Sequence, residues 1–172
     1  SNADTLSSKT ATVGFEIRNY SELLEAVDLR HKHFHDHGCR ISDHGIQELY
    51  AEEFTERSMI AIFDQIRSGK SVNPEELRSY KSGILYDFAV MDASRGWTQQ
   101  FHLGVMRNLN TRIGNKIGPD TGFDSMGDFS MAHSLSKFLD RLDSRDQLAK
   151  TIIYNLNPVY NDLIASMIGN YQ

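Results

Sequence analysis

The chain has 172 residues, a formal net charge of −5 and a single cysteine, Cys39. This length excludes a complete eight-stranded βα barrel, which needs at least about 200 residues. One cysteine excludes a disulfide framework and favours a reducing, cytoplasmic setting. The sequence has no apolar run near the roughly 18 residues of a membrane span, so a membrane is not expected as a partner. Its mild acidity argues against nucleic acid as a partner. Residues 1–3 are interpreted as an expression scar.

The first half of the chain predicts three long helices. Apolar side chains recur at helical spacing over residues 20–37, 45–67 and 73–94. Gly38 is a natural end for the first of them. Asn73 and Pro74 are a strong start for the third, because Asn caps a helix and Pro suits its first position.

The remaining segments predict shorter helices and three strands. The helices are expected over residues 105–117, 131–142 and 159–168, and the strands over residues 38–42, 98–103 and 151–156. Each predicted strand is followed at once by a helix, and this alternation indicates a parallel sheet. The expected class is therefore α/β and rich in helix.

Polar residues gather where the predicted strands end. Asp43 and His44 follow the first strand, His102 lies in the second, and Asn155 and Asn157 close the third. In parallel α/β folds the carboxyl ends of the strands hold the ligand site, so these groups are expected on one rim. Asp43 and Asn157 have an alternative role as caps of the helices that they precede. His102 caps nothing obvious, which favours a functional role.

Four stretches resemble the signature motifs of one enzyme family. They are residues 34–45 (FHDHGCRISDHG), 100–112 (QFHLGVMRNLNTR), 118–128 (GPDTGFDSMGD) and 150–158 (KTIIYNLNP), with Met167–Asn170 behind them. In this order, and over about residues 15–172, the chain resembles the uronate (glucuronate) isomerases of the amidohydrolase superfamily. Four long motifs in order are far more specific than one short pattern.

The resemblance implies a fold and an activity. Residues 4–172 would be the central segment of a TIM-type (β/α)₈ barrel, with about three βα units and a helical insertion over about residues 50–96. The family interconverts D-glucuronate with D-fructuronate, and D-galacturonate with D-tagaturonate, in cytoplasmic sugar-acid catabolism. Its members are associated with a divalent metal ion, for which zinc is the first expectation.

The same resemblance suggests roles for particular residues. His102 matches the family's active-site histidine and is expected to polarise or protonate a substrate oxygen. Arg40, Asp43 and His44 are expected at the neighbouring strand end, where they would orient His102 or reach sugar hydroxyls.

Two arginines on the next predicted helix, Arg107 and Arg112, are candidates for the substrate carboxylate, which an arginine fork binds in a bidentate manner. A structural salt bridge is an equally good interpretation of both. Three acids in the following glycine-rich loop, Asp120, Asp124 and Asp128, are expected to be solvated turn residues.

The departures from the family pattern concern the metal. The His-x-His pair of the family's first strand and the Asp-x-Arg motif of its last strand have no match here, so no complete metal site is expected in this chain. The alternating histidines His31, His33, His35 and His37 lie in a predicted helix, where residues two apart face different ways. An ordinary wet helix face is the favoured interpretation of these four residues.

Three hypotheses follow. The first is a segment of a uronate isomerase that is inactive alone and self-associates through exposed barrel surface, because isolated strands leave open edges. The second is a non-catalytic helical module for binding or assembly that descends from the same family. The third is another amidohydrolase reaction, such as hydrolysis, on the same barrel.

Overall fold

The computed structural model describes residues 12–171, so the expression scar expected at residues 1–3 lies outside the described residues. In chain order the elements are α2 (Tyr20–Asp36), β1 (Ile41–Ile46), α3 (Glu56–Arg67), α4 (Pro74–Ser94), β2 (Thr98–Leu103), β3 (Val105–Met106), α5 (Thr111–Ile117), β4 (Ser125–Met126), α6 (Ala132–Asp143), β5 (Thr151–Asn155), the 3₁₀ turn η1 (Pro158–Tyr160) and α7 (Asn161–Ile168). Within the described part of the chain, no helix is long and apolar enough to cross a membrane.

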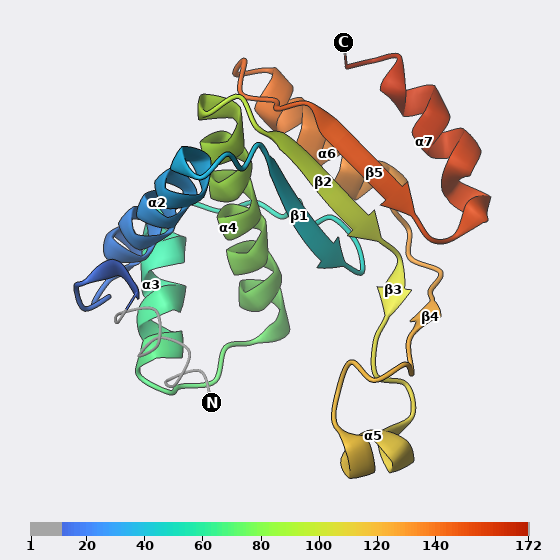
Figure 1. Ribbon diagram of the computed structural model, residues 1–172, viewed down its shortest axis with the longest axis horizontal. Coiled ribbons are helices and arrows are strands. Elements are labelled where there is room, and N and C mark those ends of the chain that lie inside the picture. The colour runs from blue at the N-terminus through green and yellow to red at the C-terminus, as the bar shows by residue number, and fades with distance from the viewer. Residues whose placement is uncertain (1–11, 172) are drawn as a thin grey trace.

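The centre of the fold is a three-stranded sheet in the order β1-β2-β5 (Figure 1). Both ladders are parallel: Ile41 pairs with Thr98 at one end of the first, and Leu103 pairs with Asn155 at one end of the second. The predicted parallel sheet of an α/β chain is therefore confirmed. The strand prediction for residues 98–103 is matched by β2 residue for residue.

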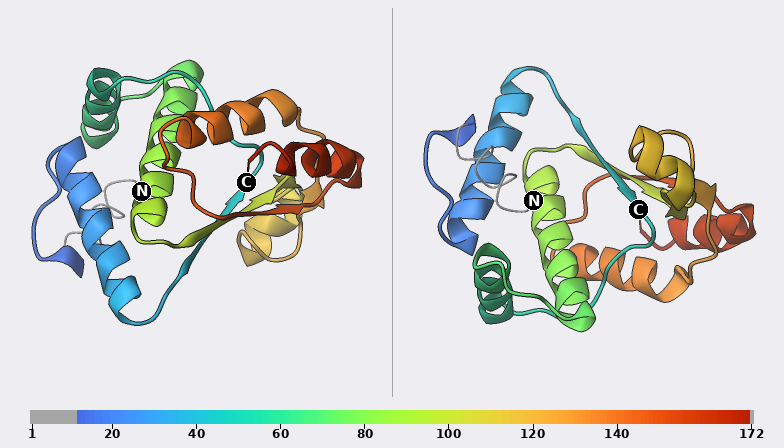
Figure 2. Two further views of the ribbon diagram at one scale, coloured as in Figure 1. Left: turned by 90° about the horizontal axis from the view of Figure 1, so that it is seen from above. Right: turned by 90° about the horizontal axis from the view of Figure 1, so that it is seen from below.

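One face of this sheet is covered by helices. Figure 2 shows α4 and α6 on the same side of the strands, and α7 packs against α6. The main core lies between these helices and the sheet, and its least exposed members come from three places: Phe101 and Leu103 of β2, Leu135 and Leu142 of α6, and Leu49 of the loop after β1. Burial of these apolar side chains is the dominant favourable term that holds the helices on the sheet.

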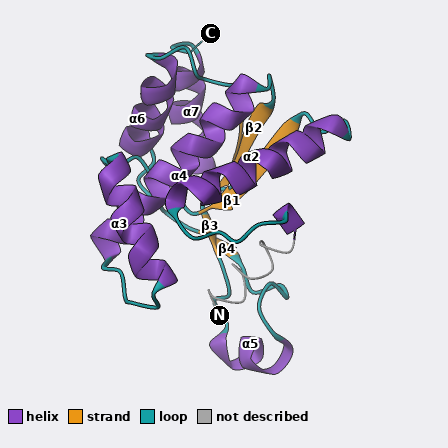
Figure 3. Ribbon diagram, turned by 90° about the vertical axis from the view of Figure 1, so that its left-hand side faces the viewer, coloured by secondary structure: helices purple, strands orange, loops and turns teal. Residues whose placement is uncertain are grey.

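A second core lies between α2, α3 and α4, which pack side by side (Figure 3). Tyr20 of α2, Phe63 of α3 and Tyr80 of α4 meet there, with Tyr20 about 6 Å from both other rings. The start of α4 forms as expected: the Asn73 side chain accepts from Glu76 N, and the Glu76 carboxylate accepts from Asn73 N. The helices of the expected insertion therefore share a second core with α2 beside the sheet, and α4 also contributes to the main core.

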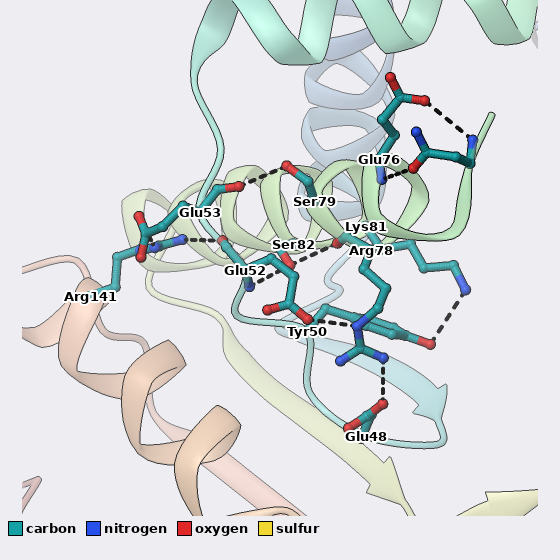
Figure 4. A network of polar contacts seen from close by, with 11 residues as sticks. Glu48, Tyr50, Glu52, Glu53, Glu76, Arg78, Ser79, Lys81, Ser82 and Arg141 are labelled. Carbon is teal, nitrogen blue, oxygen red and sulfur yellow. Dashed lines mark hydrogen bonds and ion pairs between the residues drawn. The ribbon is translucent and has the colours of Figure 1, made fainter.

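The loop that joins β1 to α3 is fastened to α4 by a polar network (Figure 4). Arg78 donates to the Glu48 carboxylate at 2.7 Å and to the Glu52 carboxylate at 2.6 Å. Ser82 accepts from the backbone N–H of Glu52 at 2.9 Å, and Arg141 of α6 donates to Glu53 at 2.9 Å. These contacts thus hold the loop that follows the carboxyl end of β1 against α4 and α6.

A small lobe extends beyond the carboxyl ends of the strands (Figure 1). It consists of the antiparallel pair β3–β4 and the short helix α5 between them. The lobe is attached to the sheet through Gly127 N, which donates to Gly104 O at 2.7 Å. Side chains of this lobe therefore lie near the end of the sheet where parallel α/β folds hold their ligands.

Three predicted boundaries are wrong. The first strand is not 38–42 but Ile41–Ile46, and the helix expected from residue 45 begins only at Glu56. The helix expected over 105–117 begins at Thr111, because β3 occupies its first residues. Strands β1 and β2 are therefore not followed at once by helices. Asp43, His44 and Gly45 have weak strand propensity, and pairing with β2 overrides it.

Candidate functional site

Alternation along β1 divides its side chains between the two faces of the sheet. Ser42, His44 and Ile46 are partly buried on the helix-covered face, whereas Asp43 and Gly45 are exposed on the other. On β2 the same alternation buries Phe101 under the helices. We refer to the uncovered side as the open face. Besides Asp43 and Gly45, it presents Ile41 of β1, Thr98, Gln100 and His102 of β2, and Ile152 and Tyr154 of β5.

His102 is at the centre of the open face. Its Nδ1 lies 2.7 Å from Oδ1 of Asp43, and its ring stacks on Tyr154 with 4.4 Å between centroids and 8° between planes. Because a carboxylate accepts hydrogen bonds, Nδ1 is the donor in this contact, and Nε2 is the ring nitrogen outside it. The structure thus brings His102 and Asp43 together as expected from the sequence, and Asp43 caps no helix.

Arg107 reaches the open face from the lobe. A Cβ built on Gly45 would lie 3.0 Å from Arg107 Nη2, so the guanidinium stands over the strand position that pairs with His102. Its Nη1 donates to Asp124 at 3.0 Å and lies 3.5 Å from Asp120. Arg107 follows β3. The prediction that placed it on the following helix is therefore wrong. The cation is held over the open face by two acids.

The other proposed residues lie elsewhere. Arg40 precedes β1, and its guanidinium donates to the carbonyl of His35 at 2.8 Å, a contact that caps the end of α2. His44 points into the covered side, where its ring stacks against Phe88 and Phe101, and burial lowers its pKa. Arg112 is an exposed residue of α5. Arg40 thus lies before β1, and His44 lies near the end of β1 on the face opposite His102, so the structure does not bring these two residues together with His102.

His44 instead lines a hollow of about 660 Å³ between β1 and α4. Its walls are mainly apolar, with Leu77, Ile84 and Phe88 from α4 and Ile46 from β1. The hollow does not include His102 or Asp43, although Gly45 and Arg107 also line it. The volume of a pocket therefore does not identify the candidate site here; the convergence of polar groups on the open face does.

The covered face holds a second imidazole–carboxylate pair. Asp92 of α4 is fully buried and accepts from the Ser42 hydroxyl at 2.5 Å. Its other oxygen lies 3.8 Å from His31 Nδ1, and neither of these two atoms has a hydrogen-bond partner among the described residues. Burial raises the pKa of Asp92 to about 6, against the opposing effects of Ser42 and Arg95, and burial lowers the pKa of His31.

The alternating histidines have structural contacts. His31 stacks on Trp97 with 5.0 Å between centroids, and His35 Nδ1 accepts from Trp97 Nε1 at 2.9 Å. The rings of His33 and His37 lie 4.3 Å apart on the exposed side. Among residues 12–171, no group of three His, Cys, Asp or Glu side chains could hold a metal ion. These residues therefore do not fit the metal that the family resemblance implies.

Two residues of the neighbourhood were not anticipated as part of the site. Tyr154 had no signal beyond the strand composition of residues 151–156, and Asp124 had been interpreted as a solvated turn residue. Asp124 accepts from both Arg107 and the backbone N–H of Asn108, so it anchors the lobe. Asn157 caps η1 by accepting from Val159 N, as its alternative role predicted, and also donates to Gly127 O.

Comparison with known proteins identifies the relatives of this chain. A family model described as glucuronate isomerase matches residues 2–172. A uronate isomerase of Bacteroides thetaiotaomicron is 48% identical over 163 residues, which cover 95% of this chain and 35% of the relative. One from Cellvibrio japonicus is 47% identical, over 94% of this chain and 34% of the relative. The chain thus spans about a third of the length of the relatives that it matches.

Solved structures agree with the sequence matches. A uronate isomerase of Thermotoga maritima superposes with a TM-score of 0.91 at 25% identity, over 98% of this chain and 37% of that one. A glucuronate isomerase of Caulobacter crescentus gives 0.82 at 27% identity, over 91% and 32%. The described fold is thus retained at low identity, and the family match extends over nearly the whole chain. This protein therefore belongs to the glucuronate isomerase family.

Proposed function

We propose that the chain is part of the active site of a uronate isomerase that interconverts D-glucuronate with D-fructuronate, and D-galacturonate with D-tagaturonate. The observation that carries this proposal is the hydrogen-bonded pair His102–Asp43 on the open face, beside the guanidinium of Arg107. The relatives named above are uronate isomerases. The proposal thus assigns a cytoplasmic sugar-acid enzyme of the amidohydrolase superfamily.

The finer fold proposal is a partial (β/α)₈ barrel made of residues 4–172. It is supported by three parallel strands whose helices all lie on one side, which is how strands and helices are layered in such barrels. In a closed barrel the open face would look inward, and His102 would lie within the ring of strands. The long segment between β1 and β2 supplies α4 as the covering helix and α3 as an addition to it.

The isomerisation is a proton transfer between neighbouring carbons. A base takes the proton from C2 of the aldose as the C1 carbonyl oxygen becomes negative, and a proton donated to that oxygen gives an enediol. The O2 proton is then removed while a proton is delivered to C1, so that the carbonyl forms at C2 and C1 keeps its hydroxyl. No electrons enter or leave. His102, whose Nε2 is the ring nitrogen not bonded to Asp43, would hold or supply the proton of a substrate oxygen, and Asp43 would stabilise the charged imidazole.

Arg107 would bind the substrate carboxylate. Its planar fork suits a bidentate contact, and its pairing with Asp124 and Asp120 orients it over the sheet. The two acids also compensate its charge when no substrate is present. Arg112 is an exposed residue of α5 in the lobe, whereas the guanidinium of Arg107 lies over Gly45 on the open face, so Arg107 is the better candidate.

A metal ion is proposed for the full-length enzyme and not for a site within this chain. Residues 12–171 do not bring three suitable ligands together, so no step is assigned to a metal. A divalent ion, zinc first, belongs to the proposal for the full-length enzyme on the strength of the family alone. The substrate is the only small-molecule partner proposed.

A segment exchange tests the proposed function. The 163 aligned residues of this chain replace their counterparts in the Bacteroides thetaiotaomicron enzyme, and conversion of D-glucuronate is measured. We expect turnover within about tenfold of the parent, and a loss of roughly 100-fold or more when His102→Gln is introduced. The matched control is His133→Gln, at an exposed position of α6. Turnover that survives His102→Gln would refute the assignment, and an inactive but folded hybrid would favour a non-catalytic module.

The isolated 172-residue chain is expected to be inactive, because it spans only about a third of its relatives. Incubation with D-glucuronate, followed by detection of the ketose, checks this. Turnover at a rate typical of enzymes, about 1 s⁻¹ or more, would show that these residues suffice for catalysis.

A further inference from the structure

The position of Tyr154 is not explained by packing of the core. It lies on β5 directly beside His102 in the parallel ladder, and its side chain points to the open face (Figure 1 shows β2 and β5 as neighbours). Its exposed fraction is 46%, which is high for a large aromatic residue paired within a sheet. Its ring lies nearly parallel to the His102 ring, at 8° and 4.4 Å.

The His102 ring is restrained from two directions. The hydrogen bond from Nδ1 to Asp43 lies in the plane of the imidazole and limits rotation about the side chain. The stack on Tyr154 acts perpendicular to that plane and limits tilting. Gly45 pairs with His102 on the other side and has no side chain that could support the ring there. The space over Gly45 holds the Arg107 guanidinium, so Tyr154 supplies the aromatic support of the His102 ring from the other neighbouring strand.

We infer that Tyr154 is a positioning residue: its ring holds the imidazole of His102 in the plane from which Nε2 faces the substrate. It acts through His102 and needs no hydroxyl, because the contact is made by the ring face. This inference rests on the proposed function for its catalytic meaning, but the restraint itself is a property of the chain. A catalytic group displaced by about 1 Å can lose roughly 100-fold in rate, so such a restraint has functional weight.

The restraint can be tested on the 172-residue chain by NMR of its seven histidines. His102→Gln assigns the His102 signals. In the wild type we expect upfield ring protons, shifted by the stacked tyrosine, and the ¹⁵N pattern of an imidazole protonated on Nδ1. Tyr154→Phe retains the stack and should preserve both signatures. Tyr154→Leu keeps bulk without an aromatic face and should move the ring protons downfield and mix the two tautomers.

The controls separate positioning from folding. Ile152→Leu changes the same strand on the same face and should leave the His102 signals unchanged. The signals of His31 and His44, which lie on the covered face, report whether each variant is folded. If Tyr154→Leu fails to fold, Tyr154→Thr, which favours strands, takes its place. Unchanged His102 signals in the folded variant, or equal loss in Tyr154→Phe, would overturn the inference.

The catalytic consequence is measured in the segment-exchange enzyme. Tyr154→Leu is expected to lower kcat by roughly 10- to 100-fold with a smaller change in KM, and Tyr154→Phe to restore most of it. If the hybrid has no turnover, the proposed function fails while the NMR result still decides the restraint. If the NMR signature changes but kcat in Tyr154→Leu does not, the positioning role is refuted.

Discussion

The two faces of the sheet carry the same chemical pair in opposite settings. On the open face, Asp43 and His102 have side chains 51% and 41% exposed and share a hydrogen bond of 2.7 Å. On the covered face, Asp92 and His31 have side chains 0% and 15% exposed and lie 3.8 Å apart without that bond. Successive residues of β1 take part in the two pairs, since Ser42 contacts Asp92 and Asp43 contacts His102.

The difference shows what burial does to an ionisable pair. Under the helices, loss of water makes the charged forms costly, so the pKa of Asp92 rises to about 6 and that of His31 falls. The covered pair thus contributes to how α2 and α4 meet the sheet. On the open face, water and ligands can reach the pair. The same two groups are therefore suited to structure on one side and to chemistry on the other.

The largest expected effect is the difference in unfolding free energy lost when a side chain is truncated on the covered face or on the open face. Phe101→Ala removes a ring that is 1% exposed and should cost about 3–5 kcal/mol of unfolding free energy. Ile152→Ala, on the open face at 39% exposed, should cost less than about 1.5 kcal/mol. Urea unfolding measures both. Equal losses would mean that the open face is covered in solution.

The next effect concerns the charge of Asp92. Its folded pKa of about 6 lies above the usual 3.8, so the folded chain holds the extra proton between these values, and stability is lost as the pH rises through them, by about 2–3 kcal/mol in total. Asp92→Asn removes this loss, and its amide can donate toward His31 Nδ1. We expect the unfolding free energy of the variant to rise relative to that of the wild type from pH 4 to pH 7. At pH 7 the Tm of the variant should be higher than that of the wild type.

This pH dependence is measured as a difference between the two proteins. His31 acts in the opposite sense, because a lowered folded pKa makes the chain less stable as the pH falls below the usual value of 6.5. That contribution is common to the wild type and to Asp92→Asn. Parallel curves of unfolding free energy against pH would show that Asp92 does not carry a raised pKa in the folded chain.

A smaller effect compares adjacent residues of β1. Ser42→Ala leaves the buried Asp92 without its hydroxyl donor and should cost about 1–3 kcal/mol at pH 7. Asp43→Asn changes an exposed group and should remain within about 0.5 kcal/mol of the wild type. Chemical denaturation checks both. A larger loss for Asp43→Asn would reverse the roles assigned to the two faces.

The smallest expected effect is self-association of the isolated chain. The open face exposes Ile41, Ile152 and Tyr154, and β1 and β5 are the outer strands. Such a surface favours contact between copies. Sedimentation should show a weight-average mass that rises with concentration, and Ile152→Lys should weaken the association about tenfold. A monomer at all concentrations, with little dye bound, would contradict it.

Much of the fold could be predicted from local signals. The helix at residues 20–37 and the strand at 98–103 follow from periodicity and composition, and Asn73 with Pro74 marks the start of α4 correctly. The strand β1 was misplaced because its residues Ser42–Ile46 have little strand propensity and are held by the ladder to β2. The β3–β4 pair is two residues long on each side, too short for any periodic signal.

The candidate site was predictable only in part. The family motifs indicated His102 and Asp43, and the structure brings them together. His44 was grouped with them because the segment was interpreted as a turn; in a strand, neighbours face opposite sides, and the pairing of Asp43 excludes His44 from the same face. Tyr154 depends on the register between β2 and β5, which no local pattern encodes.

The two long connections of the sheet have a consequence for how the chain reaches this state. In the chain, α3 and α4 lie between β1 and β2, and the lobe and α6 lie between β2 and β5. Contacts between such distant residues slow folding, since the entropy of closing the loops is lost before pairing compensates it. During synthesis, β1 would therefore emerge before β2, its partner in the sheet. The contacts of Arg78 with the loop after β1 would form before the sheet is paired. Refolding that slows when Arg78 is replaced would reveal this order.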